Sequence, residues 1–317
     1  MSEPTAFGAE VVGQLSDRSG GPEDPQDKER VRSLTRDAWD DLRRSWIFWS
    51  AFALMFFFVT MALFPGLFTD KSPTDCDAAR SVQPPSADAW FGYDLQGCDV
   101  YARSVYGARA SIAVGLLSTF VALVIGAGIG IMAGYFGGLL DSILSRVTDI
   151  FFAIPVLLGS IIILTSFPVT QTTSTNLEIT KVAIAVAVLG WTITARLARS
   201  SVIQVKNADF VLAARSLGAG NWRIIRSHVL PNALGPIIVI TTISLGAFIG
   251  AEATLSYLGI GLQPPTVSWG VQINDGQEYI QTYPFLVLFP AIFLSLTVLA
   301  FIMFGEALRE ALDPKLK

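Results

Sequence analysis

Histidine and cysteine are scarce in this chain of 317 residues, which contains one histidine, His228, and two cysteines. A structural zinc site takes four Cys or His ligands, so a zinc site built from this chain alone is nearly excluded. The sequence also lacks the GxxxxGK[ST] loop that binds nucleotide phosphates and the HExxH motif of zinc proteases. No credible nucleophile–base pair surrounds the lone histidine. We therefore expect no catalytic residue, no metal and no cofactor on this chain, and any ATP must be bound by a partner.

Charged side chains are also sparse, at 15% of residues, whereas 52% are hydrophobic. This balance is typical of membrane proteins, in which about 20 apolar residues form one transmembrane helix. We expect an all-α polytopic membrane protein with six spans, at 46–68, 107–135, 142–166, 180–201, 232–258 and 284–307. Pro155 and Pro290 fall inside the third and sixth spans, where we expect them to kink the helix rather than break it.

Small residues recur every four positions in the second span. The two rows are Gly107, Ser111, Gly115 and Thr119, and Gly126, Gly130, Gly134 and Gly138. Each row leaves one helix face without bulk, so another backbone can approach it closely. The approaching helix belongs either to the same chain or to a second subunit.

Lysine and arginine are distributed unevenly about the spans. They concentrate next to the first span, in 202–231 and after the sixth span, whereas 167–178 and 259–283 contain neither. Because basic residues favour the cytoplasmic side, this pattern places both termini and 202–231 in the cytoplasm. The loop at 69–106, with more acidic than basic residues, then faces the outside.

The expected spans divide the chain into five parts. These are a cytoplasmic tail at 1–45, a first span at 46–68, an extracytoplasmic loop at 69–106, a five-helix core at 107–307 that includes a polar segment at 209–231, and a tail at 308–317. Apolar and basic residues share helical spacing over 28–45. They predict either an amphipathic helix on the cytoplasmic membrane surface or a solvated helix that leads into the first span.

The polar segment between the fourth and fifth spans has the pattern of a helix, a glycine turn and a second helix. Its first apolar stripe, at i, i+3, i+4 and i+7, is Phe210, Ala213, Ala214 and Leu217. Gly218 and Gly220 allow a sharp change of direction, and Pro231 suits the entry into the fifth span. A second, shorter stripe follows at Trp222, Ile225 and Val229. A short polar helix–turn–helix segment between two spans predicts an element on which a partner protein docks.

This segment resembles the motif EAA-x3-G-x9-I-x-LP of bacterial ABC importer permeases. The residues at motif positions are Ala213, Ala214, Gly218, Leu230 and Pro231. Leu212 stands where the motif has glutamate, so the resemblance does not extend to an ionic contact of that glutamate. In that family the segment inserts into a cleft of an ATPase subunit. The resemblance thus implies ATPase coupling through Leu212, Ala213, Ala214, Leu217, Gly218, Trp222, His228 and Pro231.

Three further blocks resemble peptide and nickel importer permeases. They are FGYDLQGCDVYARSVYGARASIAVG at 91–115, SRVTDIFFAIP at 145–155 and EATLSYLGIGLQPPTVSWG at 252–270. Together they indicate the C-type permease subunit of a dipeptide or oligopeptide importer with the type I importer fold. The spans hold no cluster of His, Cys or Met that would favour nickel, although a nickel or other small-solute importer is the alternative. A stand-alone secondary transporter is less favoured, because no inverted repeat is visible.

The resemblance also implies a set of partners in the bacterial inner membrane. A homologous B-type permease would complete the pathway as a heterodimer, and two ATPase subunits, or one fused ATPase, would bind ATP and Mg. An extracytoplasmic solute-binding protein would deliver the peptide, and the lipid bilayer would surround the spans; no nucleic acid is implied. The implied mechanism is alternating access, in which nucleotide shifts an equilibrium between two states.

A few polar residues invite a specific role. Cys76 and Cys98 lie in the loop assigned to the oxidising side, where a disulfide is favoured over two free thiols. Glu252, near the outer end of the fifth span, is either a pathway group that meets the amino terminus of a peptide or a structural carboxylate. Asp149 is expected to pair with Arg146 at i−3.

Aromatic residues mark the expected outer face. Trp90, Trp269 and Tyr279 are expected at the outer membrane interface, where aromatic belts are common. The loops at 69–106 and 259–283 are the candidates for docking a solute-binding protein.

Overall fold

The computed structural model describes residues 39–168 and 173–312 of the chain. Parts of both tails, and most of the helix expected at 28–45, lie outside these residues. Within them, five helices are long and apolar enough to cross a membrane, or six spans form if the bent pair α4 and α5 is counted as one. The prediction of an all-α polytopic membrane protein is confirmed.

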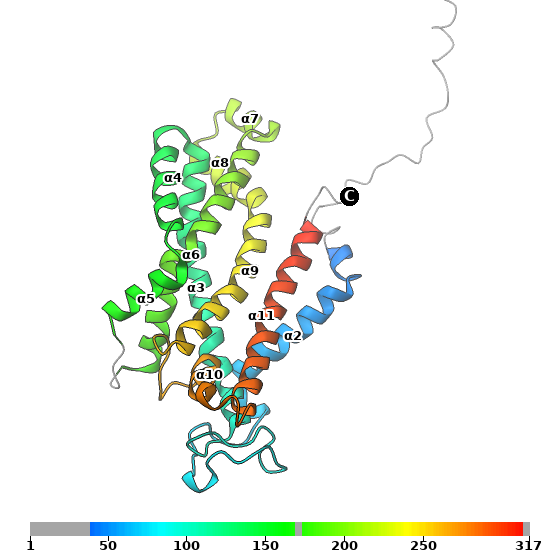
Figure 1. The fold of residues 1–317 in the computed structure, drawn as a ribbon. Helices are drawn as coiled ribbons and strands as arrows, with labels where there is room; N and C mark the ends of the chain where they lie inside the picture. Colours follow the sequence, from blue (N-terminus) through cyan, green and yellow to red (C-terminus); the bar gives the residue numbers. More distant parts are fainter. Residues whose placement is uncertain (1–38, 169–172, 313–317) are drawn as a thin grey trace, which may run out of the picture.

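The helices form one bundle with two distinct ends (Figure 1). The long helices are α2 (Trp46–Leu63), α3 (Val100–Phe136), α4 (Gly138–Phe152), α5 (Val156–Ser166), α6 (Thr175–Lys206), α9 (Leu230–Tyr257) and α11 (Phe285–Leu312). The short helices are α7 (Asp209–Ser216), α8 (Asn221–Ile224), α10 (Trp269–Gly276) and the turns η1 (Pro65–Leu67), η2 (Ala78–Arg80), η3 (Ile225–Val229) and η4 (Gln277–Tyr279). α7 and α8 lie at the end where α2 begins and α11 stops, whereas α10 and the loop before α3 lie at the opposite end.

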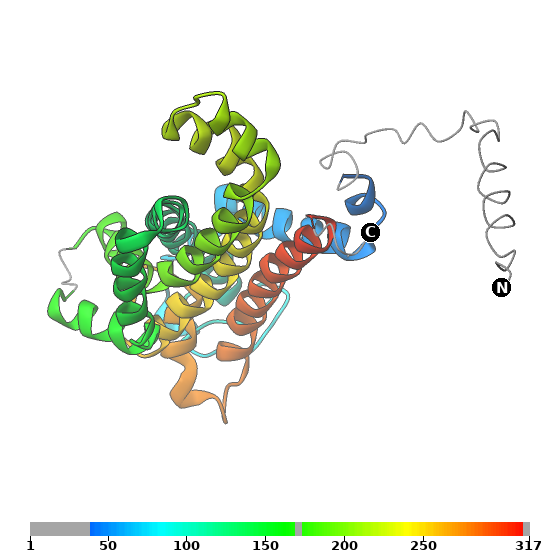
Figure 2. The same ribbon diagram turned by 90° about the horizontal axis from the view of Figure 1, so that it is seen from above.

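α3 and α6 form the centre of the bundle, with α2 and α11 to one side and α4 and α5 to the other (Figure 2). A Cβ atom built at Gly126 would lie 2.6 Å from the carbonyl oxygen of Trp191 on α6. One built at Gly134 would lie 2.8 Å from the carbonyl oxygen of Arg199. The small residues of α3 therefore admit the backbone of α6, so the intramolecular alternative is confirmed for this row. Gly138 does not belong to the row, since α3 ends at Phe136.

The two span prolines behave differently. Pro290 lies inside the continuous helix α11, as predicted. Pro155 separates α4 from α5, whose axes differ in direction by 82°, so the prediction of a mere kink was wrong there. Pro155 precedes α5 directly, and proline disfavours the helical conformation of the residue before it. Pro290 is the sixth residue of α11, and the helix continues through it although its missing N–H removes one backbone hydrogen bond.

Candidate functional site

The polar segment at 209–231 leaves the bundle directly from α6. Two residues connect α6 to α7. α7 ends at Ser216 with Leu217 as its C-cap, and the chain then turns through Gly218, which has a φ of +82°. The N–H of Ala219 donates to the carbonyl oxygen of Ala214 at 3.1 Å, which closes the turn. A φ of this sign is easiest for glycine, so the sequence-predicted turn depends on Gly218.

Large apolar side chains of this segment point outward. Leu217 is 89% exposed and Trp222 is 73% exposed, while Phe210 and Leu212 are close to half exposed. We call these four residues the coupling surface. They are held in place by Val211 and Ile224, which are fully buried against the ends of α3, α6 and α9. Exposed apolar side chains gathered on one element make this surface a candidate for contact with a protein or a membrane.

The second half of the segment differs from the sequence prediction at one residue. Ile225 and Val229 are buried as one stripe, but Trp222 faces outward and Ile224 takes the inner position. η3 is a turn of π-helix, whose extra residue per turn changes which side chains share a face.

The remaining predicted coupling residues border the coupling surface. Ala213 is exposed and Ala214 half-buried, and Pro231 is exposed in the first turn of α9. His228 is half-buried, with its ring 6.4 Å from that of Phe210. The structure thus brings the sequence-predicted set together at one end of the bundle.

Glu252 lies inside the protein, near the opposite end. Its side chain is fully buried, and Ser256 donates a hydrogen bond of 2.8 Å to its Oε1 atom. Its Oε2 atom has no hydrogen-bond partner among the described residues. This environment favours the structural alternative, and unchanged transport by a Glu252→Gln variant would remove the residue from the pathway.

A second buried carboxylate, Glu178 in the first turn of α6, was missed in the sequence. It accepts hydrogen bonds from the N–H of Gln263 at 2.5 Å and from the hydroxyl of Thr266 at 2.6 Å. These contacts tie the loop after α9 to α6. The sequence does show an acidic residue at the start of a span, which could have indicated a buried carboxylate. Its hydrogen-bond partners lie more than 80 residues away, so the sequence could not identify them.

The long loop before α3 is cross-linked. A disulfide joins Cys76 to Cys98 across 22 residues, and Cys98 is buried. The N–H of Cys98 also donates to the carboxylate of Asp94 at 2.9 Å. The disulfide therefore restrains the part of the loop that carries Asp94.

We expect the unreduced protein to show no alkylation at either cysteine. Replacing both cysteines by serine is expected to destabilise the loop by about 3 kcal/mol, because the open loop gains conformational entropy when it unfolds. Limited proteolysis of the loop, with Ser81→Ala as an exposed control, measures the loss. Two freely alkylated thiols in the native protein would contradict the disulfide.

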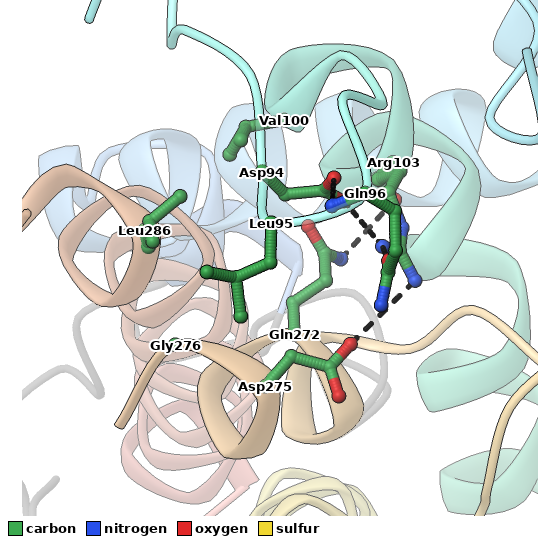
Figure 3. A pocket seen from close by; sticks show the side chains of 9 residues that line it. All are labelled: Asp94, Leu95, Gln96, Val100, Arg103, Gln272, Asp275, Gly276 and Leu286. Atoms are coloured by element: carbon green, nitrogen blue, oxygen red, sulfur yellow. Dashed lines mark hydrogen bonds and ion pairs between the residues drawn. The ribbon is translucent and has the colours of Figure 1, made fainter. Parts of the chain in front are cut away.

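Asp94 belongs to a charged cluster that fastens the loop to the bundle (Figure 3). The guanidinium of Arg103, on α3, lies between the carboxylates of Asp94 and Asp275 and also donates to the side chain of Gln96 at 3.0 Å. Asp275 belongs to α10, and its Oδ2 atom lies 3.7 Å from the Nη2 atom of Arg103. Burial raises the pKa of the Asp275 carboxyl above its usual value, and the Arg103 charge opposes that rise. One buried cation thus joins the loop, α3 and α10.

The predicted outer aromatic residues separate into two groups. Trp90 is 64% exposed, as an interfacial side chain would be. Trp269 is fully buried, and its indole N–H donates to the backbone oxygen of Ser104 at 2.9 Å, so the interfacial prediction was wrong for it. Trp269 begins α10, a helix that the sequence analysis did not recognise within 259–283.

Known proteins resemble most of this chain. Residues 126–317 match the family model described as "Binding-protein-dependent transport system inner membrane component". The dipeptide transport system permease protein DppC of Alkalihalophilus pseudofirmus is 38% identical over 293 residues, which cover 92% of this chain and 94% of the relative. The oligopeptide transport system permease protein OppC of Bacillus subtilis is 35% identical over 317 residues, covering 100% of this chain and 97% of the relative.

A solved structure shares the fold. An inward-facing conformation of the MetNI methionine ABC transporter superposes with a TM-score of 0.53 and 22% identity, covering 67% of this chain and 96% of that chain. At this identity the likeness concerns the fold alone.

Proposed function

Because this chain belongs to the family of binding-protein-dependent transport system inner membrane components, we propose that it is the transmembrane permease subunit of an ATP-driven importer of di- and oligopeptides. The coupling surface carries the proposal, since it presents apolar side chains to a partner at one end of a membrane bundle. The names of two relatives, a dipeptide and an oligopeptide permease, support the substrate class. A nickel or other small-solute importer is the alternative.

The proposal assigns energy supply and substrate capture to partners. A homologous permease would complete the pathway as a heterodimer. Of two ATPase subunits carrying ATP and Mg, one would dock on the coupling surface and the other on the homologous permease. A solute-binding protein would dock at the opposite end, where α10 and the disulfide-linked loop lie. The coupling surface would face the cytoplasm together with both termini, as the basic residues of 202–231 favour.

Uptake by the reconstituted complex tests this function. Vesicles that contain this chain, its partner permease and the ATPases are expected to accumulate a labelled dipeptide only with ATP and the solute-binding protein present. An Ala213→Cys variant is expected to cross-link to an ATPase subunit, because this position is exposed beside the coupling surface. If the purified chain transports peptide alone without ATP, the proposal fails. Uptake of nickel in place of peptide favours the alternative.

A further inference from the structure

Helix α4 stands apart from the tightly packed centre of the bundle. All of its residues are described, and Thr148 is the one that is buried. Apolar side chains such as Leu139, 77% exposed, and Ile150, 65% exposed, lie on its free side. Hydrophobic packing of α4 within this chain is concentrated at its C-terminal end, where the ring of Phe151 lies 5.6 Å from that of Trp191 on α6.

Two ion pairs connect α4 to α6. Asp141 accepts two hydrogen bonds from the guanidinium of Arg199, at 2.5 and 2.7 Å. Two turns further along α4, Asp149 accepts from Arg196 at 2.8 Å, which corrects the prediction that Asp149 pairs with Arg146. Asp149 could pair either with Arg146 on its own helix or with an arginine on a facing helix. Sequence spacing detects only the first kind of pair, so it could not identify Arg196. The two pairs run along facing stripes of the two helices.

A partly open cavity of about 400 Å³ lies beside these ion pairs, and Asp149, Arg196 and Arg199 line it. Its walls come from α3, α4 and α6, and they include Gly130, Ala133, Thr148 and Ala195 as well as the paired groups. Small side chains and an unfilled volume leave α4 room to approach α3. In contrast, α3 and α6 are in backbone contact at Gly126 and Gly134 and have no such room.

The chain also has a sharp bend after α4 and a direct connection from α6 to the coupling surface. The break between α4 and α5, at residues 153–155, bends the pair by 82° and interrupts the helical hydrogen bonding. At the other side of the ion pairs, α6 continues without interruption from Arg199 to Lys206, and α7 begins three residues later. Arg196 and Arg199 therefore lie on the same continuous helix that leads, through two connecting residues, into α7.

We infer that these two ion pairs transmit movement of the coupling surface to α4, which turns about the break at Pro155 and changes the volume of the cavity. This inference rests on the proposed transport function. Asp141, Asp149, Arg196 and Arg199 are then positioning residues for transport, acting through α4 rather than by contact with nucleotide.

Charge reversal in the reconstituted complex tests the inference. Arg199→Asp is expected to reduce peptide uptake by about tenfold while ATP hydrolysis continues. The swapped variant, Asp141→Arg with Arg199→Asp, is expected to recover uptake to within about threefold of the unaltered complex, since it restores the pair. Arg309→Asp is the control, because Arg309 pairs with Glu306 on its own helix and not with α4. Normal uptake by Arg199→Asp, or a swapped variant no better than the single one, overturns the inference.

A second measurement does not depend on the reversed variant folding. Thr148→Cys places a thiol on the buried, cavity-lining face of α4, and the native cysteines are held in the disulfide. Alkylation by a water-soluble maleimide is expected to change at least about threefold in rate between the nucleotide-free complex and the complex with a non-hydrolysable ATP analogue. Equal rates in a complex that transports peptide would refute the inference and leave the proposed function intact. A complex that transports no peptide would instead refute the proposed function.

Discussion

Gly218→Asp is expected to reduce ATP-driven peptide uptake by more than about tenfold while the subunit still inserts and pairs with its partner permease. Nothing lies within 4 Å of a Cβ atom built at Gly218, so the substitution does not collide with the chain itself. Its effect falls on the docked ATPase, against which a carboxylate would lose water without gaining a partner. Each 1.4 kcal/mol or so of that cost weakens docking tenfold.

Two further variants separate the causes of this loss. Gly218→Asn has nearly the shape of the aspartate variant and also tolerates positive φ, so the difference between the two isolates the charge. Gly218→Ala isolates the backbone strain at a φ of +82°. Uptake and ATP hydrolysis are measured in the same vesicles. Normal uptake by the aspartate variant would show that Gly218 is outside the docking element.

The sequence predicted where the helices lie better than where they begin. The second span was expected from residue 107, but α3 begins at Val100. Asp99 accepts a hydrogen bond from the N–H of Ala102 at 3.0 Å and caps this helix. The capping residue was visible in the sequence, although hydropathy gives no weight to an aspartate outside the membrane. Local polar signals therefore correct span boundaries that apolar length alone misplaces.

The partners of polar residues were beyond the sequence. Asp149 was paired with its neighbour in sequence, whereas its ion-pair partner lies 47 residues away. Trp269 was placed at the membrane interface because aromatic residues are common there, but its N–H is satisfied inside the protein. Helix packing decides which buried polar groups contact one another. No short-range pattern in a single sequence identifies these contacts. The short helix α7 and the turn at Gly218 were predicted correctly, because both depend on local sequence.

Arg103→Met is expected to destabilise the end of the protein that carries α10 by about 3–5 kcal/mol, the usual effect of leaving buried charges without their counterion. The Arg103 side chain is 9% exposed, and it lies between Asp94 and Asp275, whose side chains are 13% and 25% exposed. Thermal unfolding of the purified complex measures the loss. Arg80→Met is the matched control, since Arg80 pairs with Asp77 at an exposed position of the same loop, and such pairs contribute about 1 kcal/mol or less.

Acidification should reduce the defect of Arg103→Met. Burial raises the pKa of Asp275 in the folded protein, so the folded state binds that proton more tightly than the unfolded chain does. The ionised carboxylate therefore destabilises the fold above its folded pKa, and this cost falls as the pH falls through that value. Without Arg103 the opposing charge is gone and the pKa of Asp275 rises further. The variant should consequently gain stability relative to the native protein as the pH is lowered from 8 to about 5. A defect that is independent of pH would mean that lost packing, and not an uncompensated carboxylate, destabilises the variant.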